Sequence, residues 1–363
     1  MISSRSGSLR ELGELSLLDW IRQRAVKKTR GKGLLLGIGD DAAAFRVPAG
    51  EILLATSDAM AEGVHFDLSY TTYYQAGFKL VSVNASDIYA MGGAPRYALL
   101  DLSAPPELKF KDISSFFDGV LDALASYGAL LAGGDVTASK SGLVLGMSMI
   151  GSAKKIVTRG GAKPGDTVYV TGFLGDSACG LELLKKLGRP VGIEKGKSAS
   201  FGLKNRGGKQ VRLDWNTAGP LVKRHLMPMA KKPPKTATAM IDISDGLAID
   251  LIRLCKESRV GVKIYEDLLP VSEGLKKSAP VLGLAPLKLA LGGGEDYELL
   301  YTAGYRASEK PSAFRSRGQN HNKKYKAWRI GEITRSGYII QGRGGEEREL
   351  KVEGYEHFTA RKT

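Results

Sequence analysis

Cysteine and histidine are scarce in this chain of 363 residues. Only two residues are cysteines, Cys179 and Cys255, and only four are histidines. The cysteines lie far apart in the sequence and form no CxxC pair, which excludes a cysteine-built zinc site and a disulfide framework. No HExxH motif or paired-histidine spacing is present, so the pattern also disfavours a zinc hydrolase.

Long apolar runs are missing as well. No uninterrupted apolar stretch approaches the roughly 18 residues that a membrane-spanning helix needs. The N-terminal segment MISSRSGSLRELGELSLLDWIRQR interrupts its apolar residues with charges and so has no secretory apolar region. We therefore expect a cytoplasmic protein with no membrane partner. A composition of 43% hydrophobic and 25% charged residues is ordinary for a globular chain, and the length predicts two domains at roughly 150 residues each.

Acidic residues are outnumbered, since 53 Lys and Arg stand against 38 Asp and Glu, a net charge of +15. Basic proteins gain affinity for nucleic acids by displacing phosphate counterions. Much of the excess falls in two stretches with the composition of loops, residues 184–212 and 306–329. Neither interleaves aromatic and basic residues regularly, and no RNP, zinc-finger or KH signature occurs. Solubilising insertions are the favoured interpretation, and a nucleic-acid-binding role stays open as an alternative.

Strand and helix patterns alternate along the chain, which is typical of an α/β fold. The segment GAKPGDTVYVTG opens a second α/β region with a Pro-Gly turn and a β-branched strand. We therefore predict an α/β fold with mixed sheets in two domains. Examples of the predicted elements are helices over 11–28 and 71–93, strands over 51–58 and 129–135, and a helix around VKRHLMPMAKK broken by prolines. The predicted domains are 1–153 and 154–363, with a basic insertion at about 187–215 in the second.

Carboxylates recur at the ends of the apolar strands, beside glycines or small hydroxyl residues. Strand ends in α/β folds converge on one edge, where such folds place ligands. Acids gathered there must be neutralised, because close like charges disfavour each other's ionisation, and hard divalent cations choose oxygen ligands. Asp87 joins the set from a helix, on one face with Asn84 at i, i+3 spacing. The strand-end sites are Gly39-Asp40-Asp41, Thr56-Ser57-Asp58, Gly133-Gly134-Asp135, Asp242-Ile243-Ser244-Asp245-Gly246 and Gly293-Gly294-Glu295-Asp296.

The glycines beside these acids indicate phosphate binding. Without a side chain they let backbone N–H groups approach phosphate oxygens closely. Carboxylate-bound Mg²⁺ usually keeps substrate phosphates in its remaining positions, so we expect nucleotide phosphates bridged by Mg²⁺. The chain has no GxxxxGK[ST] motif and no HRD/DFG set, which excludes a Walker-type ATPase and a protein kinase.

Each of these residues has a simpler interpretation when it is taken alone. A single Asp next to Gly is more often a turn residue or a helix N-cap than a metal ligand. His65 could simply pack, His225 is assigned a structural role, and Arg159 could be a surface residue or a phosphate contact. Asp176 and Asp250 are assigned to helix starts or to the surface. Five acidic strand ends in one chain are much harder to explain as turns.

Seven segments carry most of these residues: GIGDDAA, TSDAMAEGVHF, VNASDIYAMGG, LLAGGDVT, TRGGAKPGDTVYVTG, IDISDGLAIDL and LGGGEDYEL. In this order they resemble the thiamine-monophosphate kinase family, and the resemblance runs from about residue 13 to GYEHF at 354–358. The family belongs to a superfamily with aminoimidazole ribonucleotide synthetase, selenophosphate synthetase and a hydrogenase-maturation protein. The resemblance implies an aminoimidazole-ribonucleotide-synthetase-like fold whose N-terminal domain forms a homodimer through its sheet. Selenophosphate synthetase would need a reactive Cys or selenocysteine near the N-terminus, and no Cys precedes Cys179.

The resemblance implies a kinase that converts thiamine phosphate and ATP into thiamine diphosphate and ADP with the help of several Mg²⁺ ions. Asp58, Asp87 and Asp135 would form the central metal scaffold. The family commonly has an aromatic residue three positions before Tyr355, and this chain has Val352 at that position. A ring-stacking role for residue 352 is therefore in doubt. The implied metal ligands are Asp41, Thr56, Ser57, Asp58, Asp87, Asp135, Asp242 and Asp245. The implied ATP contacts are Gly134, Asp135, Arg159 and Ser244, and the implied contacts to thiamine phosphate are His65, Glu295 and Tyr355.

The residue types suit this reaction without a protein nucleophile. The acceptor is a phosphate monoester with a second pKa of about 6, so it is largely dianionic at neutral pH and a general base would add little. Several Mg²⁺ ions would screen the repulsion between the two polyanions and stabilise a loose transition state. We predict direct in-line transfer, with the Glu295 carboxylate near the cationic thiazolium ring. Another ATP-dependent synthetase of the same superfamily is the alternative.

Overall fold

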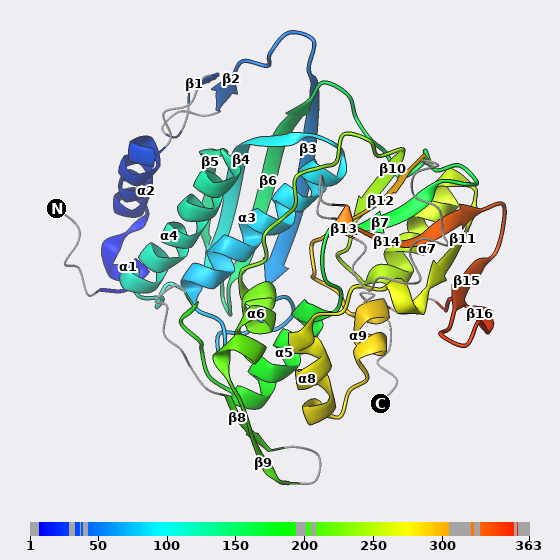
Figure 1. Ribbon diagram of the computed structural model, residues 1–363. Coiled ribbons are helices and arrows are strands. Elements are labelled where there is room, and N and C mark those ends of the chain that lie inside the picture. Colours follow the sequence, from blue (N-terminus) through cyan, green and yellow to red (C-terminus); the bar gives the residue numbers. More distant parts are fainter. Residues whose placement is uncertain are drawn as a thin grey trace. The chain divides into compact units, whose positions relative to one another are not determined.

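The structure of the protein is a computed structural model. It describes residues 7–28, 33–36, 38, 43–193, 201–204, 208–304, 321–322, 327–351 and 354. The chain divides into an N-terminal unit (1–89, 93–156 and 188–195) and a C-terminal unit (90–92, 157–187 and 196–363). Each unit combines helices with a mixed sheet (Figure 1), which confirms the predicted fold class. Within the described residues, no helix is both long enough and apolar enough to cross a membrane.

A four-stranded mixed sheet forms the centre of the N-terminal unit. Its order is β3 (Ile52–Ala61), β6 (Val144–Ala153), β4 (Ala94–Ala104) and β5 (Leu130–Ala138). β4 and β5 run parallel, whereas β6 pairs antiparallel with both β3 and β4. β3 and β5 are therefore the two edges of the sheet. The unit also contains α1 (Leu9–Leu12), α2 (Glu14–Lys28), β1 (Leu34–Leu36) and β2 (Ala44–Phe45).

In the described part of the N-terminal unit, helices cover one face of this sheet. α3 (Tyr73–Ala90) and α4 (Phe110–Tyr127) lie across it (Figure 1). Strand side chains on the covered face are buried, with Leu100 4% and Met147 0% exposed. On the opposite face the side chain of Leu53 is 47% exposed. The alternation of buried and exposed residues along the strands follows from this one-sided cover.

α3 and α4 approach each other closely through two glycines. A Cβ atom at Gly77 would lie 2.3 Å from the carbonyl oxygen of Phe116, and one at Gly119 would lie 1.9 Å from that of Tyr74. No larger residue fits at either position unless a backbone moves. Because α3 carries Asp87, this contact between helices fixes the position of an acidic residue of the candidate site.

A larger mixed sheet organises the C-terminal unit. Its order is β10-β12-β7-β14-β11-β15-β16, with β13 paired to β14, and all of its pairs are antiparallel except that of β11 with β15. Buried aliphatic residues such as Val168, Leu251 and Ile330 form the core. The strands are β7 (Thr167–Val170), β10 (Ala239–Asp242), β11 (Gly261–Tyr265), β12 (Leu299–Ala303), β13 (His321–Asn322), β14 (Ala327–Thr334), β15 (Tyr338–Gln341) and β16 (Glu347–Glu349). The helices are α5 (Asp176–Leu187), α6 (Trp215–Leu226), α7 (Leu247–Ser258), α8 (Glu273–Leu282), α9 (Pro286–Gly292) and the short 3₁₀ turn η2 (Glu266–Leu268).

Part of the basic insertion forms a hairpin, so the prediction of a loop is wrong there. β8 (Phe201–Lys204) pairs antiparallel with β9 (Gln210–Leu213). Phe201 is fully buried and its ring stacks on Trp215, with 5.8 Å between the ring centroids. Trp215 begins α6, so an aromatic contact attaches the hairpin to the helix behind it.

Two predicted helices have different bounds in the structure. The helix predicted over 11–28 is divided at Gly13, whose φ of 76° lies in the left-handed region and ends α1. The helix expected around VKRHLMPMAKK begins earlier, at Trp215, where the Asp214 side chain caps it by accepting from the Thr217 N–H. It also contains Pro220, which lacks an N–H donor and so leaves one intrahelical hydrogen bond unmade.

Candidate active site

Two predicted acidic ligands meet where β3 lies against α3. Asp58 belongs to β3, and Asp87 belongs to the last turn of α3. Thr56 lies on the same face of β3 as Asp58, because strand side chains alternate with a period of two. Its Oγ1 donates to Oδ2 of Asp87 at 2.5 Å. Three residues predicted to bind metal are therefore neighbours in the N-terminal unit.

The Asp58 carboxylate is held in an unfavourable environment. Its Oδ2 is buried and has no hydrogen-bond partner among the described residues. Burial, followed by the charge of Asp87 and the hydrogen bond with it, raises the pKa of Asp58 to about 7. Two carboxylates this close destabilise each other's charge until a cation neutralises them.

The atoms of this cluster suit a hard divalent cation. Carboxylate, hydroxyl and amide oxygens are the ligands that Mg²⁺ takes. Asn84, fully buried one turn before Asp87, leaves its Oδ1 without a hydrogen-bond partner in the described part of the chain. The described residues contain no group of three or more His, Cys, Asp or Glu side chains that could hold a metal. A cation at Asp58 and Asp87 would therefore need further ligands, such as the substrate phosphates that Mg²⁺ usually takes beside one or two carboxylates.

Two other predicted ligands of this unit lie away from the cluster. The side chain of Ser57 points to the opposite face of β3 from Thr56, and its Oγ accepts from Oγ of Ser148 at 3.2 Å. Asp135 is exposed on β5, at the opposite edge of the sheet from Asp58. Three inter-strand spacings separate β3 from β5, which amounts to roughly 14 Å along the sheet. The sheet of one chain therefore does not bring Asp135 to Asp58.

Gly134, a predicted ATP contact, has a structural reason to be glycine. Its φ is 147°, and a Cβ atom there would lie 1.9 Å from the carbonyl oxygen of Leu100 on β4. The close approach of β4 and β5 beside Asp135 therefore requires glycine at this position. Asp41, the remaining predicted ligand of this unit, lies outside the described residues.

His65, a predicted substrate contact, lies in a turn that is fixed from two sides. Its Nδ1 accepts from the backbone N–H of Ala61 at 3.1 Å. The ammonium of Lys79, a residue only 3% exposed on α3, donates to the carbonyl oxygen of His65 at 3.2 Å. The pattern of the sequence did not identify Lys79, because a lysine at one position of a helix predicts a solvent-exposed side chain.

In the C-terminal unit the acidic turn after β10 is closed by Asp250. Oδ2 of Asp250 accepts from the backbone N–H groups of Ser244, Asp245 and Gly246 at 3.1, 3.1 and 3.2 Å. Asp250 is fully buried, which corrects the surface assignment and leaves the helix-start assignment. The backbone N–H groups expected to cradle phosphate are thus already occupied in this turn, which leaves the hydroxyl of Ser244 as its available donor.

Asp242 and Asp245, both predicted metal ligands, have different surroundings. Asp242 ends β10 and is 4% exposed. The carboxylate of Asp245 accepts from Nη1 of Arg253 at 2.5 Å, and the same nitrogen donates to Asp250 at 2.8 Å. A cation bound to Asp245 would therefore either share its carboxylate with Arg253 or displace the Arg253 side chain.

The Glu295 turn lies directly beside the Ser244 turn. The N–H of Glu295 donates to the carbonyl oxygen of Ser244 at 2.7 Å. A Cβ atom at Gly294 would lie 2.6 Å from that same oxygen, so this glycine permits two acidic turns to touch. The Glu295 side chain is 28% exposed, and its Oε2 lies 3.1 Å from Nδ1 of the buried His225. The structural role assigned to His225 therefore includes contact with a predicted substrate residue.

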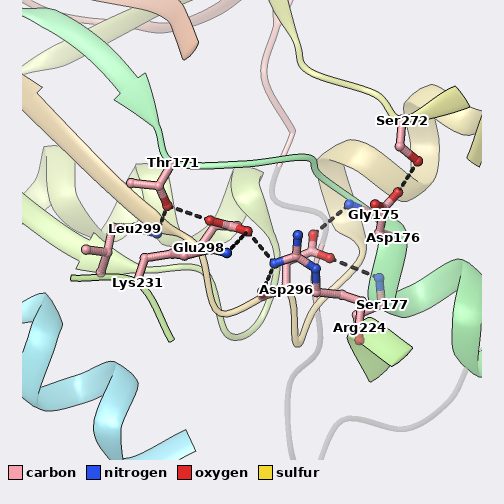
Figure 2. Close-up of polar contacts among 10 residues, drawn as sticks. All are labelled: Thr171, Gly175, Asp176, Ser177, Arg224, Lys231, Ser272, Asp296, Glu298 and Leu299. Atoms are coloured by element: carbon pink, nitrogen blue, oxygen red, sulfur yellow. Dashed lines mark hydrogen bonds and ion pairs between the residues drawn. The ribbon is translucent and has the colours of Figure 1, made fainter. Parts of the chain in front are cut away.

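A buried charged cluster, which the sequence did not indicate, surrounds this turn (Figure 2). Asp296 and Glu298 are both fully buried, and Asp176 is 4% exposed. Nη1 of Arg224 donates both to Oε1 of Glu298 and to the backbone oxygen of Asp296. Lys231 lies 3.6 Å from Glu298. Arg224 was not identified because its local sequence, KRHL, carries no signal for a buried ion pair.

The remaining predicted contacts are simple to place. Arg159 is exposed, and its carbonyl oxygen accepts from Oγ of Ser258 at 2.7 Å. Tyr355 and Val352 lie outside the described residues.

Comparisons with known proteins give one family model and several relatives. The family model for the AIR synthase related protein, N-terminal domain, matches residues 39–153. Thiamine-monophosphate kinase of Aquifex aeolicus (strain VF5) is 37% identical over 299 residues, which are 81% of this chain and 87% of that protein. A solved structure described as AaThiL complexed with AMPPCP and TMP has 32% identity and a TM-score of 0.68, covering 98% of this chain and 100% of that one. The crystal structure of thiamine-monophosphate kinase from Stenotrophomonas maltophilia K279a has 30% identity and a TM-score of 0.70, over 91% and 96% of the two chains.

Proposed function

The chain belongs to the thiamine-monophosphate kinase family, and we propose that it transfers the γ-phosphoryl group of ATP directly to thiamine monophosphate. The products would be thiamine diphosphate and ADP. The observation that carries this proposal is the close pair of Asp58 and Asp87, because the buried, unpartnered Oδ2 of Asp58 and the raised pKa of that residue suit a cation bound between the protein and phosphate. A relative of this fold described as complexed with AMPPCP and TMP supports the two substrates.

Transfer is proposed to be in line, without a phosphorylated protein intermediate. Both reacting groups are anionic, and the acceptor phosphate is already deprotonated at neutral pH. Several Mg²⁺ ions would supply screening of this repulsion and stabilise charge on the transferring group. The chain's own task is to hold oxygen ligands in place, and Thr56 does so for Asp87 by fixing its Oδ2 with a hydrogen bond.

The residues are proposed to divide the work by unit. Asp58, Asp87 and Asp135 are the proposed catalytic scaffold. The proposed metal ligands of the N-terminal unit are Asp41, Thr56, Ser57, Asp58, Asp87 and Asp135. The proposed metal ligands of the C-terminal unit are Asp242 and Asp245. Gly134, Asp135, Arg159 and Ser244 would contact ATP, and His65, Glu295 and Tyr355 would contact thiamine monophosphate.

The hydrogen bonding of His65 and Glu295 suits these roles. Because Nδ1 of His65 accepts from the Ala61 N–H, a neutral His65 carries its proton on Nε2 and donates from there. Nε2 is thus suited to a phosphate oxygen of the substrate. Glu295, part exposed and anionic, suits the cationic thiazolium ring, because positive ligand charge favours the ionised carboxylate.

We also propose that the protein acts as a homodimer in the cytoplasm. The uncovered face of the N-terminal sheet supports the dimer, since it exposes Leu53 (47%) and Val144 (45%). Apolar side chains grouped on one face of a sheet are typical of an interface.

The direct test is to incubate purified protein with thiamine monophosphate, MgCl₂ and ATP labelled in its γ-phosphoryl group. We expect thiamine diphosphate that carries the label, identified by mass, and no product when EDTA removes Mg²⁺. ADP and free phosphate without thiamine diphosphate would instead indicate another ATP-dependent synthetase of the superfamily. Labelled protein that forms before the product would contradict direct transfer.

A further inference from the structure

Glu295 lies in a segment whose backbone is unusual. Glu295 and Tyr297 have φ values of 62° and 48°, in the left-handed region that residues with a side chain rarely adopt. Such conformations persist only where the surrounding structure enforces them, and they concentrate at functional sites. The question is therefore which contacts hold this turn.

Asp296, between these two residues, is fully buried and fixes the turn to the start of α5 (Figure 2). Its Oδ2 accepts from the N–H of Gly175 at 2.6 Å, and its Oδ1 accepts from the N–H of Ser177 at 3.0 Å. Helix N-termini present unpaired N–H groups and a partial positive charge, so they stabilise a buried carboxylate. Both carboxylate oxygens of Asp296 are used in this way.

Arg224 holds the same turn from the other side (Figure 2). Its Nη1 donates to the backbone oxygen of Asp296 at 3.3 Å and to Oε1 of Glu298. Glu298 is itself fixed, because its Oε2 accepts from Oγ1 of Thr171 at 2.6 Å. Gly172 makes room for this carboxylate, since a Cβ atom there would lie 2.3 Å from Oε1 of Glu298.

These contacts fix the backbone on both sides of Glu295 without touching its carboxylate. The N–H of Glu295 donates to Ser244, and the N–H of Tyr297 donates to the carbonyl oxygen of Ile243 at 3.0 Å. The Glu295 side chain is thereby directed out of a strained turn, with Oε2 near His225. A relaxed turn would change the direction of this side chain, because its φ would return to negative values.

We propose that Asp296, Arg224 and Glu298 form a positioning group that holds Glu295 in its left-handed conformation and so sets the affinity for a cationic, phosphorylated substrate. The inference rests on the proposed function, since it assigns Glu295 to that substrate. It adds that this positioning group acts on substrate affinity and not on ATP. The Ser244 turn, which is assigned to ATP, is held separately, because the Asp250 carboxylate accepts from three backbone N–H groups of that turn.

The test is the Asp296→Asn variant, which keeps the size of the side chain but turns one acceptor oxygen into an amide that faces an N–H donor. We expect KM for thiamine monophosphate to rise about 10-fold or more, with KM for ATP changed less than about twofold. Titration calorimetry with thiamine monophosphate alone should show the same loss, and this measurement does not depend on turnover.

Asp176→Asn is the matched control. Asp176 belongs to the same buried cluster, but its Oδ1 accepts from Oγ of Ser272 and no described hydrogen bond joins it to the Glu295 turn. We expect this variant to fold and to change neither KM. If Asp296→Asn does not fold, Arg224→Lys is the second test, because a lysine ammonium cannot reproduce the planar fork of arginine.

The outcomes separate the two proposals. A wild-type protein that makes no thiamine diphosphate overturns the proposed function, whatever the variants do. An active wild type with an unchanged KM for thiamine monophosphate in Asp296→Asn, or in Arg224→Lys where that is the variant that folds, overturns the positioning group alone. An equal rise in both KM values, or the same rise in Asp176→Asn, also overturns it, because the effect would then be that of a loosened fold.

Discussion

At the scale of single residues, Asp58 shows a conflict between stability and function. A carboxyl group whose pKa is higher in the folded than in the unfolded protein destabilises the fold when it is ionised. The pKa of Asp58 is raised to about 7 from 3.8, so this effect is absent below about pH 4 and complete above about pH 7. Such a residue persists where a bound cation offsets the repulsion.

Asp58→Asn should therefore stabilise the metal-free protein while it removes activity. In EDTA at pH 8 we expect the unfolding temperature to rise by roughly 3–8 °C, because the amide removes a buried charge next to Asp87. Thiamine diphosphate synthesis with Mg²⁺ should fall by about 100-fold or more. Asp19→Asn, at an exposed position of α2, is the control and should change neither quantity. An Asp58→Asn variant with nearly normal activity would remove Asp58 from the site.

The two cysteines should be inert in the folded protein. Burial raises the pKa of both Cys179 and Cys255 to about 12, so at pH 8 roughly one thiol in ten thousand is ionised, against about a quarter for an exposed cysteine. Reaction with Ellman's reagent at pH 8 should be negligible in native protein and reach two thiols per chain in guanidinium chloride. Rapid reaction of a native thiol would contradict the burial of that side chain.

Single residues also show which features of the site the sequence can predict and which it cannot. Acid beside glycine or a small hydroxyl residue at the end of an apolar run is the pattern on which Asp58 and Glu295 were predicted as site residues. It was not enough to identify Lys79 or Arg224, because a buried cation is specified by partners that lie 14 and 74 positions away. Separation along the chain, and not residue type, limits prediction here.

At the scale of elements, the contact between α3 and α4 decides the place of Asp87. Substituting alanine for glycine inside a helix is usually favourable by about 1 kcal/mol. At Gly119 the opposite should hold, because the added Cβ atom would lie 1.9 Å from a carbonyl oxygen of α3 and only a shift of the helix could relieve the overlap. Overpacking of this kind costs about 1–3 kcal/mol and is occasionally worse.

Gly119→Ala should therefore lower the free energy of unfolding of the N-terminal unit by about 2 kcal/mol in urea titrations. The activity of the folded fraction should also fall, because displacement of α3 moves Asp87 away from Asp58. Gly202→Ala, on strand β8, is the matched control, since a Cβ atom there meets nothing within 4 Å. Equal stability of the two variants would show that α3 and α4 can separate without cost.

Prediction of elements succeeded where the pattern is local and failed where tertiary contacts decide. The strand over 51–58 and the helix over 71–93 were expected and correspond to β3 and α3. The hairpin formed by β8 and β9 was not expected, since its short strands contain basic residues and its Phe201 ring stacks on Trp215, which lies outside the hairpin. Apolar periodicity within so short a segment does not reveal such a contact.

At the scale of the whole molecule, the positions of Asp58 and Asp135 give a reason for a second copy. They lie on the two edge strands of one sheet, three strand spacings apart. Asp135 lies in register with Asp101 and, through it, with Gly146, so it belongs to the uncovered face through which a homodimer would form, whereas Asp58 belongs to the face covered by α3. The proposed dimer and the proposed metal scaffold are therefore connected.

Leu53→Glu should dissociate this dimer. It places a charge on the uncovered face, where Leu53 is 47% exposed in the single chain, so it should leave the fold of one chain intact while burial against a second copy becomes unfavourable. Light scattering should give twice the 38.9 kDa of one chain for the wild type and 38.9 kDa for the variant.

Ile156→Glu is the control. It adds the same charge at a residue that is 37% exposed beyond the end of β6, and it should keep the wild-type mass. Because Asp135 of one chain does not reach Asp58 of the same chain, thiamine diphosphate synthesis should fall together with the mass. A fully active monomer would contradict both the dimer and the place of Asp135 in the metal scaffold.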